Sequence, residues 1–213
     1  MKQIPVLLLL AFALSFCNLS NKLKRLGNSS ESGKSNSNTG SSDTGGAAIE
    51  HPEPTAAQIA ALAGGQNIAW EKQGMSWTVP AKWTRSSDED KTIVWRSPGG
   101  AEAASLIVNI STMDESFPTD VSLKAFYDGA KTRAKNGEVD ELKWLEIDGL
   151  KGVEFRESNP SKADDFRRLQ WLAYRKFGGQ VQMINLMLAT NGKGFPKHQD
   201  EMYGVLYSTK VVH

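Results

Sequence analysis

Catalysis by a serine or cysteine nucleophile needs a nearby base, and in most enzymes that base is a histidine. The chain has three histidines, of which His51 closes a polar segment and His213 is the last residue. His198 precedes Met202 by four residues and Leu206 by eight, which places it on the same stripe of a predicted helix. A packed structural histidine is the favoured interpretation, and an envelope hydrolase using His198 is the alternative.

Other patterns for catalysis or metal binding are weak. The sequence contains no Gly-x-Ser-x-Gly elbow, phosphate-binding glycine loop or dinucleotide fingerprint. Zinc has no cluster of cysteine and histidine to bind. Asp88-Glu89-Asp90 and Asp164-Asp165 offer oxygens to a hard cation but do not follow the calcium-loop spacing. We therefore predict no catalytic residue, no metal site and no cofactor, and we interpret these acids as solvated loop residues.

The six tryptophans are many for a domain of this size. Trp171 alternates in phase with Leu169, which indicates burial, whereas Trp144 aligns with Leu142 and Glu146, which indicates half exposure. Exposed aromatic residues beside arginine are common anchors of binding surfaces. We predict that most tryptophans belong to the core. As an alternative, a candidate binding surface consists of Trp144, Arg167, Arg168 and Arg175.

The only cysteine, Cys17, follows an apolar run from Ile4 to Phe16. As a helix this run of about 13 residues would extend only about 20 Å, short of the roughly 30 Å hydrocarbon core of a bilayer. The segment Leu14-Ser15-Phe16 resembles a bacterial lipobox in its first two positions, although Phe16 departs from the usual small residue. The pattern predicts that residues 1–17 are a signal peptide ending at a lipidated Cys17. A signal with an incidental cysteine and a short uncleaved anchor are the alternatives.

The next segment is polar. From Gly27 to Ala48 the chain is almost entirely Ser, Gly, Asn and Thr, a composition that cannot bury enough apolar surface to fold. We predict that residues 18–53 are a disordered tether, of which the 22 polar residues would reach roughly 25 Å. The net charge of +1 creates no field that would attract nucleic acid. The predicted partners are a membrane, through lipid on Cys17, and an unidentified envelope protein or small ligand.

The remaining residues, 54–213, are enough for one domain with a substantial core. Three helices are predicted, namely Pro54–Leu62 with Thr55 as its cap, a long one from a Thr119 cap to Ala134, and a last one from about Pro196. The predicted strands are Ile68–Trp70, Ser76–Val79, Thr92–Arg96, Ala104–Ile110, Leu142–Ile147, Lys151–Arg156, Phe166–Phe177 and Val181–Thr190. Turns at Asp148-Gly149 and Gly178-Gly179 predict two hairpins among the last four strands.

The strand Val181–Thr190 indicates the architecture because it is apolar in both phases of its alternation. A strand that is apolar on both faces is covered on both faces. Because its neighbours are joined by hairpins, the sheet is predicted to be mainly antiparallel with helices on each side. The predicted fold class is α+β, in the form of an α/β/α sandwich.

This order of elements, opened by the segment Val79-Pro80-Ala81-Lys82-Trp83, resembles the PsbP-like fold over roughly Trp70 to Val212. That group includes a photosystem accessory protein, a nuclear-transport factor that binds a GTPase, and bacterial envelope lipoproteins of the DcrB and LpqN kind. The resemblance implies a binding or accessory role, and it implies structural roles for Pro80 and Trp83 alone. We therefore predict a non-catalytic, membrane-tethered binding or accessory protein of the bacterial cell envelope. A purely structural envelope protein is a further alternative.

Overall fold

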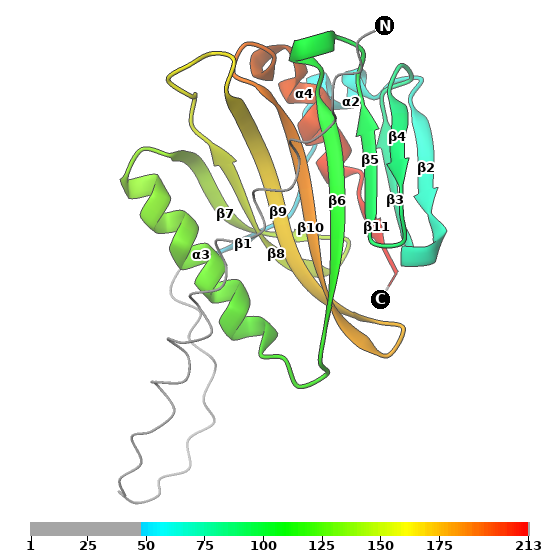
Figure 1. Ribbon diagram of the computed structural model, residues 1–213, viewed down its shortest axis with the longest axis vertical. Helices are drawn as coiled ribbons and strands as arrows, with labels where there is room; N and C mark the ends of the chain where they lie inside the picture. Colours follow the sequence, from blue (N-terminus) through cyan, green and yellow to red (C-terminus); the bar gives the residue numbers. More distant parts are fainter. Residues whose placement is uncertain (1–47, 213) are drawn as a thin grey trace, which may run out of the picture. The chain divides into compact units, whose positions relative to one another are not determined.

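The computed structural model describes residues 48–212. The predicted signal peptide, Cys17 and almost all of the predicted tether therefore lie outside the described residues. The described part contains two sheets and three α-helices, and their packing is visible in Figure 1.

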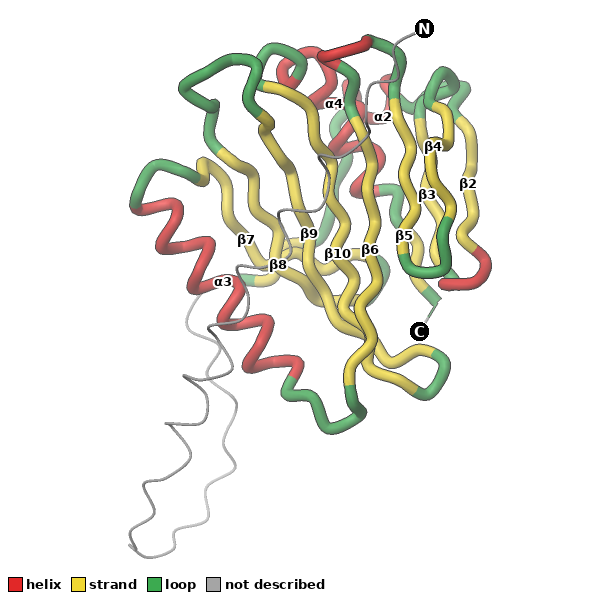
Figure 2. Tube along the Cα trace, in the orientation of Figure 1, coloured by secondary structure: helices red, strands yellow, loops and turns green. Residues whose placement is uncertain are grey.

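The larger sheet has eight strands and is antiparallel except at one end, where its first strand runs parallel to its neighbour. In spatial order the strands are β1 (Ile49–Glu50), β7 (Val139–Ile147), β8 (Leu150–Glu157), β9 (Phe166–Phe177), β10 (Gln180–Asn191), β6 (Ser105–Met113), β5 (Thr92–Arg96) and β4 (Thr84–Asp88). Figure 2 shows the long central strands of this sheet side by side.

The register of β7 against β8 is set by the two-residue turn between them. Asp148 and Gly149 both have positive φ, at 52° and 80°, as a type I′ hairpin turn requires. Because this turn pairs Ile147 with Leu150, it also pairs Lys143 with Glu154 farther along the hairpin. The turn thereby fixes which charged residues face each other across the two strands.

One face of the large sheet is covered by a mixed layer. That layer consists of α4 (Phe195–Tyr207), the short helix α2 (Ala56–Ala61) and a three-stranded sheet of β11 (Lys210–Val211), β3 (Met75–Val79) and β2 (Gln66–Trp70). The main core lies between the two layers and includes Trp77, Trp83 and Trp171, each with at most 2% of its surface exposed. Burying aromatic side chains of this size removes a large apolar area from water and stabilises the fold.

The opposite face is covered by α3 (Thr119–Lys135), which packs through Leu123 and Ala130 onto β7, β8 and β9. Figure 1 shows α3 and α4 on opposite faces of the sheet. None of the helices within residues 48–212 combines the length and the apolar character needed to cross a membrane.

The predicted α+β class and the mainly antiparallel sheet are confirmed. Thr55 caps α2 as predicted, and its side chain forms a reciprocal capping box with Gln58. Thr119 is not a cap, because it is the first residue of α3 and no side chain caps that helix. The expected domain start at residue 54 is also too late, since Ile49 and Glu50 of the predicted tether pair with β7.

The covering of the large sheet differs from a simple sandwich of helices. The strands predicted at 68–70 and 76–79 do not belong to the large sheet. They form the small sheet together with β11, a strand that the sequence pattern did not predict. The strand β4 was also not predicted, because its residues are polar and mostly exposed. Apolar alternation detects strands with a buried face, and edge strands of this kind lack one.

Candidate functional site

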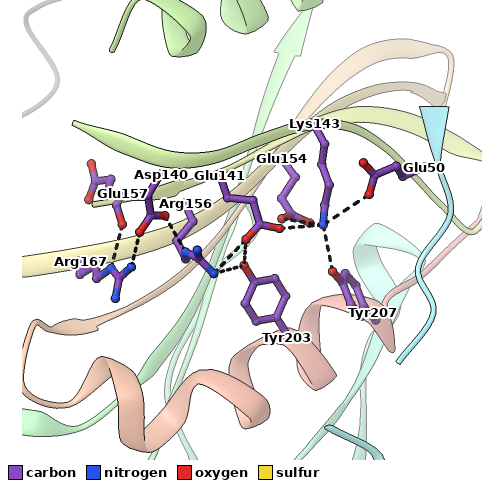
Figure 3. Close-up of polar contacts among 10 residues, drawn as sticks. All are labelled: Glu50, Asp140, Glu141, Lys143, Glu154, Arg156, Glu157, Arg167, Tyr203 and Tyr207. Atoms are coloured by element: carbon purple, nitrogen blue, oxygen red, sulfur yellow. Dashed lines mark hydrogen bonds and ion pairs between the residues drawn. The ribbon is translucent and has the colours of Figure 1, made fainter. Parts of the chain in front are cut away.

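A network of charged and tyrosine side chains lies between the large sheet and α4 (Figure 3). We call it the interlayer network, and its members are Glu50, Asp140, Glu141, Lys143, Glu154, Arg156, Arg167, Tyr203 and Tyr207. The strands β1, β7, β8 and β9 supply the ionic groups, and α4 supplies the two hydroxyls. Such a concentration of ionisable groups in a protein interior is the strongest candidate for a functional site in the described part of the chain.

Lys143 is the centre of one half of the network. Its Nζ lies 2.9 Å from Glu141 Oε1, 3.3 Å from Glu154 Oε1 and 3.8 Å from Glu50 Oε2. It also donates to the hydroxyl of Tyr207 at 3.3 Å. Burial acts to lower the pKa of Lys143, but the neighbouring Glu154 and Glu141 carboxylates outweigh it, and the pKa is raised. The amine is therefore protonated and is neither a nucleophile nor a base.

Glu154 is the most buried member of the network, with none of its surface exposed. Burial and the Glu141 carboxylate raise its pKa and Lys143 lowers it, and the net effect is a pKa raised to about 8. Neither carboxylate oxygen forms a hydrogen bond among the described residues. The direction of this pKa shift favours the protonated form of Glu154, because a buried neutral acid costs much less desolvation than a buried carboxylate.

Arg156 and Tyr203 form the second half of the network. Arg156 donates to Asp140 Oδ1 at 2.7 Å and to the Tyr203 hydroxyl at 3.0 Å. Tyr203 in turn donates to Glu141 Oε2 at 2.6 Å. Burial would raise the pKa of Glu141, but the bonds from Tyr203 and Lys143 outweigh it, and the pKa is lowered. Glu141 is therefore the ionised acid that joins the two halves.

One end of the network is held by Arg167, which stacks on the ring of Phe195. Arg167 donates to Asp140 Oδ2 at 2.7 Å and to the carbonyl oxygen of Glu157 at 2.8 Å. Its guanidinium carbon lies 4.0 Å from the ring centroid of Phe195, the first residue of α4. A guanidinium bonded in its plane and stacked on its face is fixed in position. Arg167 thus fastens the start of α4 to the sheet.

The four residues of the predicted binding surface are not brought together. Trp144 is 6% exposed, so its predicted half exposure is wrong, and its ring stacks on Tyr127 of α3 at 4.6 Å between centroids. Arg167 belongs to the interlayer network on the opposite face of the sheet. Arg168 lies on the α3 side and pairs with Glu157. A surface built from these residues is therefore not present.

Arg175, the fourth predicted surface residue, is also buried. It lies near the far end of β9, where it donates to Gln182, to the carbonyl oxygen of Gln73 and to that of Val212. Burial lowers its pKa to about 10, and no carboxylate among the described residues forms an ion pair with it. These bonds tie the turn between β2 and β3 and the end of the small sheet to the large sheet, which is a structural role.

His198 is 17% exposed in its side chain, and its Nδ1 lies 2.7 Å from Glu201 Oε2. The two residues are three apart on α4 and lie on the same side of the helix. Among residues 48–212 no group of three or more His, Cys, Asp or Glu side chains is arranged to hold a metal ion. The geometry therefore supplies a histidine oriented by an acid. Among the described hydrogen bonds, no serine or other nucleophile contacts this pair.

Two shallow hollows lie on the described surface. One, of about 340 Å³, lies at the end of the small sheet and is lined by residues that include Gly74, Asp148 and Val212. The other, of about 240 Å³, is lined by Thr112, Met113, Asp114 and Gln180. Neither is lined by a member of the interlayer network. The network joins α4 and β1 to the large sheet.

The hairpin predicted at Asp148-Gly149 contained the signal that could have revealed the network. Counting outward from that turn pairs Lys143 with Glu154 and Glu141 with Arg156. Each pair therefore places a basic residue opposite an acidic one. The polar alternation was compatible with a solvent-facing surface, and only the packing of Tyr203 and Tyr207 over it identifies it as an interior.

No protein-family model and no curated protein matches this sequence. Among solved structures, that of LpqN, described as involved in cell envelope biogenesis of Mycobacterium tuberculosis, matches with a TM-score of 0.52 and 12% identity over 70% of this chain and 90% of LpqN. Cyanobacterial PsbP from Synechocystis matches with a TM-score of 0.43 and 15% identity over 69% and 92% of the two chains.

The Ran-binding protein Mog1p of Saccharomyces cerevisiae matches with a TM-score of 0.42 and 10% identity over 70% and 95% of the two chains. The two scores below 0.5 add nothing to the argument. At 12% identity the match to LpqN shows the fold alone. The predicted resemblance to envelope proteins of the LpqN kind is therefore confirmed at the level of the fold: this domain has the α+β fold of LpqN.

Proposed function

We propose that this chain is a membrane-tethered binding or accessory protein of the bacterial cell envelope that works without catalysis. The observation that carries the proposal is the use that the domain makes of its ionisable groups. Lys143 is protonated and surrounded by acids, and Arg156 and Arg167 are bonded to acids, a hydroxyl and backbone. These groups hold layers of the fold together and are not presented to a substrate.

The envelope location is supported by two further points. The apolar run ending at Cys17, followed by a polar segment, is typical of an exported protein held to a membrane by lipid. LpqN, whose fold this domain shares, is described as involved in cell envelope biogenesis. The domain would then act at a membrane surface by binding an envelope protein or a small ligand.

The location is tested by expressing the full chain and its Cys17→Ser variant in a bacterium and separating membrane from soluble fractions. We expect the parent protein in the membrane fraction with acyl chains on Cys17, detected by mass spectrometry of the N-terminal peptide. We expect the variant to carry no acyl chains on its N-terminal peptide, since serine lacks the thiol to which they attach. An unmodified N-terminus downstream of Cys17 would rule out the lipoprotein assignment.

The contact between His198 and Glu201 favours a second candidate, a hydrolase that uses His198 as its base. His198→Ala separates the two because a helix-edge histidine contributes little packing, and its removal should lower stability by no more than about 1–2 kcal/mol. Glu201→Gln is the matched variant that keeps the shape and removes the charge. If either variant kept its thermal midpoint yet lost a hydrolytic activity or the cellular phenotype, the hydrolase would replace the binding protein.

A further inference from the structure

Among the described residues, the outer side of the edge strand β7 is paired along only part of its length. It has nine residues, and β1 pairs with only two of them, Ile49 opposite Trp144 and Glu50 opposite Leu145. In the described part of the chain no other strand lies on this side. A long edge strand is a template for pairing with another chain, and proteins usually cover such edges more completely.

The hairpin turn determines which backbone groups of β7 point outward. In a two-residue hairpin the closing pair, Ile147 and Leu150, exchanges hydrogen bonds, and bonded pairs then recur at every second residue. Leu145 and Lys143 therefore bond inward to β8, whereas Leu142, Trp144 and Glu146 direct their amides and carbonyls outward. The register of β1 reaches Trp144, and within residues 48–212 no strand pairs with Leu142 on this side.

The segment that occupies this edge is weakly held. Ile49 is 41% exposed, and the side chains of Glu50 and His51 are 58% and 68% exposed. Their polar contacts are long, with Glu50 Oε2 3.8 Å from Lys143 Nζ and His51 Nδ1 3.7 Å from Glu146 Oε1. Exposed pairs of this kind contribute little stability, so a competing strand can displace β1.

We propose that the outer edge of β7 is a docking site for an extended segment of a partner protein, which pairs parallel to β7 and displaces β1. The chain's own segment defines the chemistry of that partner: an apolar residue at the position of Ile49, an acidic residue facing Lys143 and a basic residue facing Glu146. Backbone hydrogen bonds along β7 supply affinity, and these three positions supply selectivity. This inference rests on the proposed binding role and adds the surface that performs it.

Displacement of β1 has a second consequence. Because β1 directly follows the polar segment that ends at Ala48, its release lengthens the chain between that segment and α2. A partner strand that pairs with more than two residues of β7 gains bonds that β1 does not make. The exchange therefore favours a longer partner segment over the chain's own short one.

The test uses a fluorescent peptide of residues 46–53 of this sequence as the probe and measures its anisotropy with the full chain. The double variant Ile49→Pro/Glu50→Pro opens the edge, since proline cannot donate to a ladder. We expect the peptide to bind this variant at least tenfold more tightly than the parent, because the tethered segment no longer competes. Equal binding to both proteins, or no binding to the variant, would overturn the proposal.

A charge exchange tests the register. Adding Glu146→Lys to the double variant should weaken binding of the parent peptide at least threefold, and a peptide with glutamate at the position of His51 should recover it. An unchanged affinity would show that the peptide binds elsewhere. Sedimentation of the double variant distinguishes a second copy as occupant: dimerisation through the opened edge, with no peptide binding, would reject a partner segment.

Hydrogen exchange on the unaltered full chain keeps the proposal testable if the proline variant does not fold. A longer peptide that extends the probe past its N-terminal end with alternating valine and threonine should slow exchange at the outward amide of Leu142. Unchanged exchange there at saturating peptide would contradict the proposal. Since neither measurement depends on lipid or on Cys17, their failure leaves the envelope location standing, and a failure of the fractionation experiment leaves the docking site standing.

Discussion

The two faces of the β7–β8 hairpin are each covered by a helix, but the contacts are of opposite kinds. On the α3 side the strands present an apolar surface that packs against that helix: Leu142, Trp144, Val153 and Phe155. On the α4 side the same two strands present charges: Glu141, Lys143, Glu154 and Arg156. Apolar packing tolerates small rearrangements because it has no direction, whereas buried charges require specific partners.

Replacing one lysine on each face of the hairpin compares how much each face contributes to stability. Lys143→Ala leaves the Glu141 and Glu154 carboxyl groups without their cation, and we expect the free energy of unfolding to fall by about 3–5 kcal/mol. Lys151 lies over the ring of Trp144 on the α3 side, with its Nζ 4.5 Å from the centroid, and Lys151→Ala should lower it by less than about 1 kcal/mol. Urea unfolding of both variants measures the difference, and equal losses would contradict it.

The pH dependence of stability isolates Glu154. Its pKa is about 8 in the fold against 4.5 for the free side chain, so between these values the native state keeps a proton that the unfolded state has lost. Its contribution is complete below about pH 4.5 and is lost as the pH rises through 8. Relative to the parent, Glu154→Gln should therefore gain about 2–4 kcal/mol between pH 5 and pH 8.

The parent itself will also lose stability on acidification, because the pKa values of Glu141 and Glu157 are lowered in the fold. Glu157 is present in both proteins, so the difference between parent and Glu154→Gln removes its contribution, whereas Glu141 interacts with Glu154 and part of its contribution stays in the difference. Urea midpoints at pH 5, 6.5 and 8 give the comparison. A difference that did not change with pH would mean that Glu154 is ionised in the fold.

The two tyrosines of α4 test how the network divides. The Tyr203 hydroxyl joins Glu141 to Arg156, and Tyr203→Phe should lower the free energy of unfolding by about 1–3 kcal/mol by leaving buried charges unbonded. The Tyr207 hydroxyl only accepts one 3.3 Å bond from Lys143, and Tyr207→Phe should lower it by about 0.5 kcal/mol. Thermal unfolding of the pair is the measurement, and the reverse order would place the centre of the network at Tyr207.

Converting part of the charged face to an apolar one is expected to have the smallest effect. In Lys143→Met/Glu154→Leu the central pair is replaced by apolar groups of similar size, and Glu141 keeps Arg156 and Tyr203. We expect stability within about 1 kcal/mol of the parent, since such replacements are often neutral. A loss as large as that of Lys143→Ala would show that the layer depends on charge at this position.

Much of the fold followed from local patterns. The limits of β5 and β9 were predicted to the residue, and the helix α3 was predicted from its apolar spacing. The short strands β1, β4 and β11 were not, because two to five residues, most of them polar or exposed, carry no periodic signal. Their pairing depends on neighbours far away in the sequence.

The candidate site was predicted less well. Trp171 is fully buried as its phase indicated, whereas Trp144, Arg167 and Arg175 were placed on a surface and are buried. Tryptophan and arginine occur both at interfaces and in interiors, so their type does not decide between these environments. The sequence also contains opposite charges that pair across the Asp148-Gly149 hairpin, and these are the signal of the interlayer network.

The sequence by itself determined the fold class, the two long hairpins and their registers, because turn chemistry and alternation act between near neighbours. Only the tertiary structure decided that the polar face of β7 and β8 is an interior, since that depends on α4, whose Tyr203 lies 47 residues beyond Arg156. It likewise decided that Ile49 and Glu50 join the sheet at its edge. Burial is a property of what packs over a surface, and a strand's own residues do not specify it when they are polar.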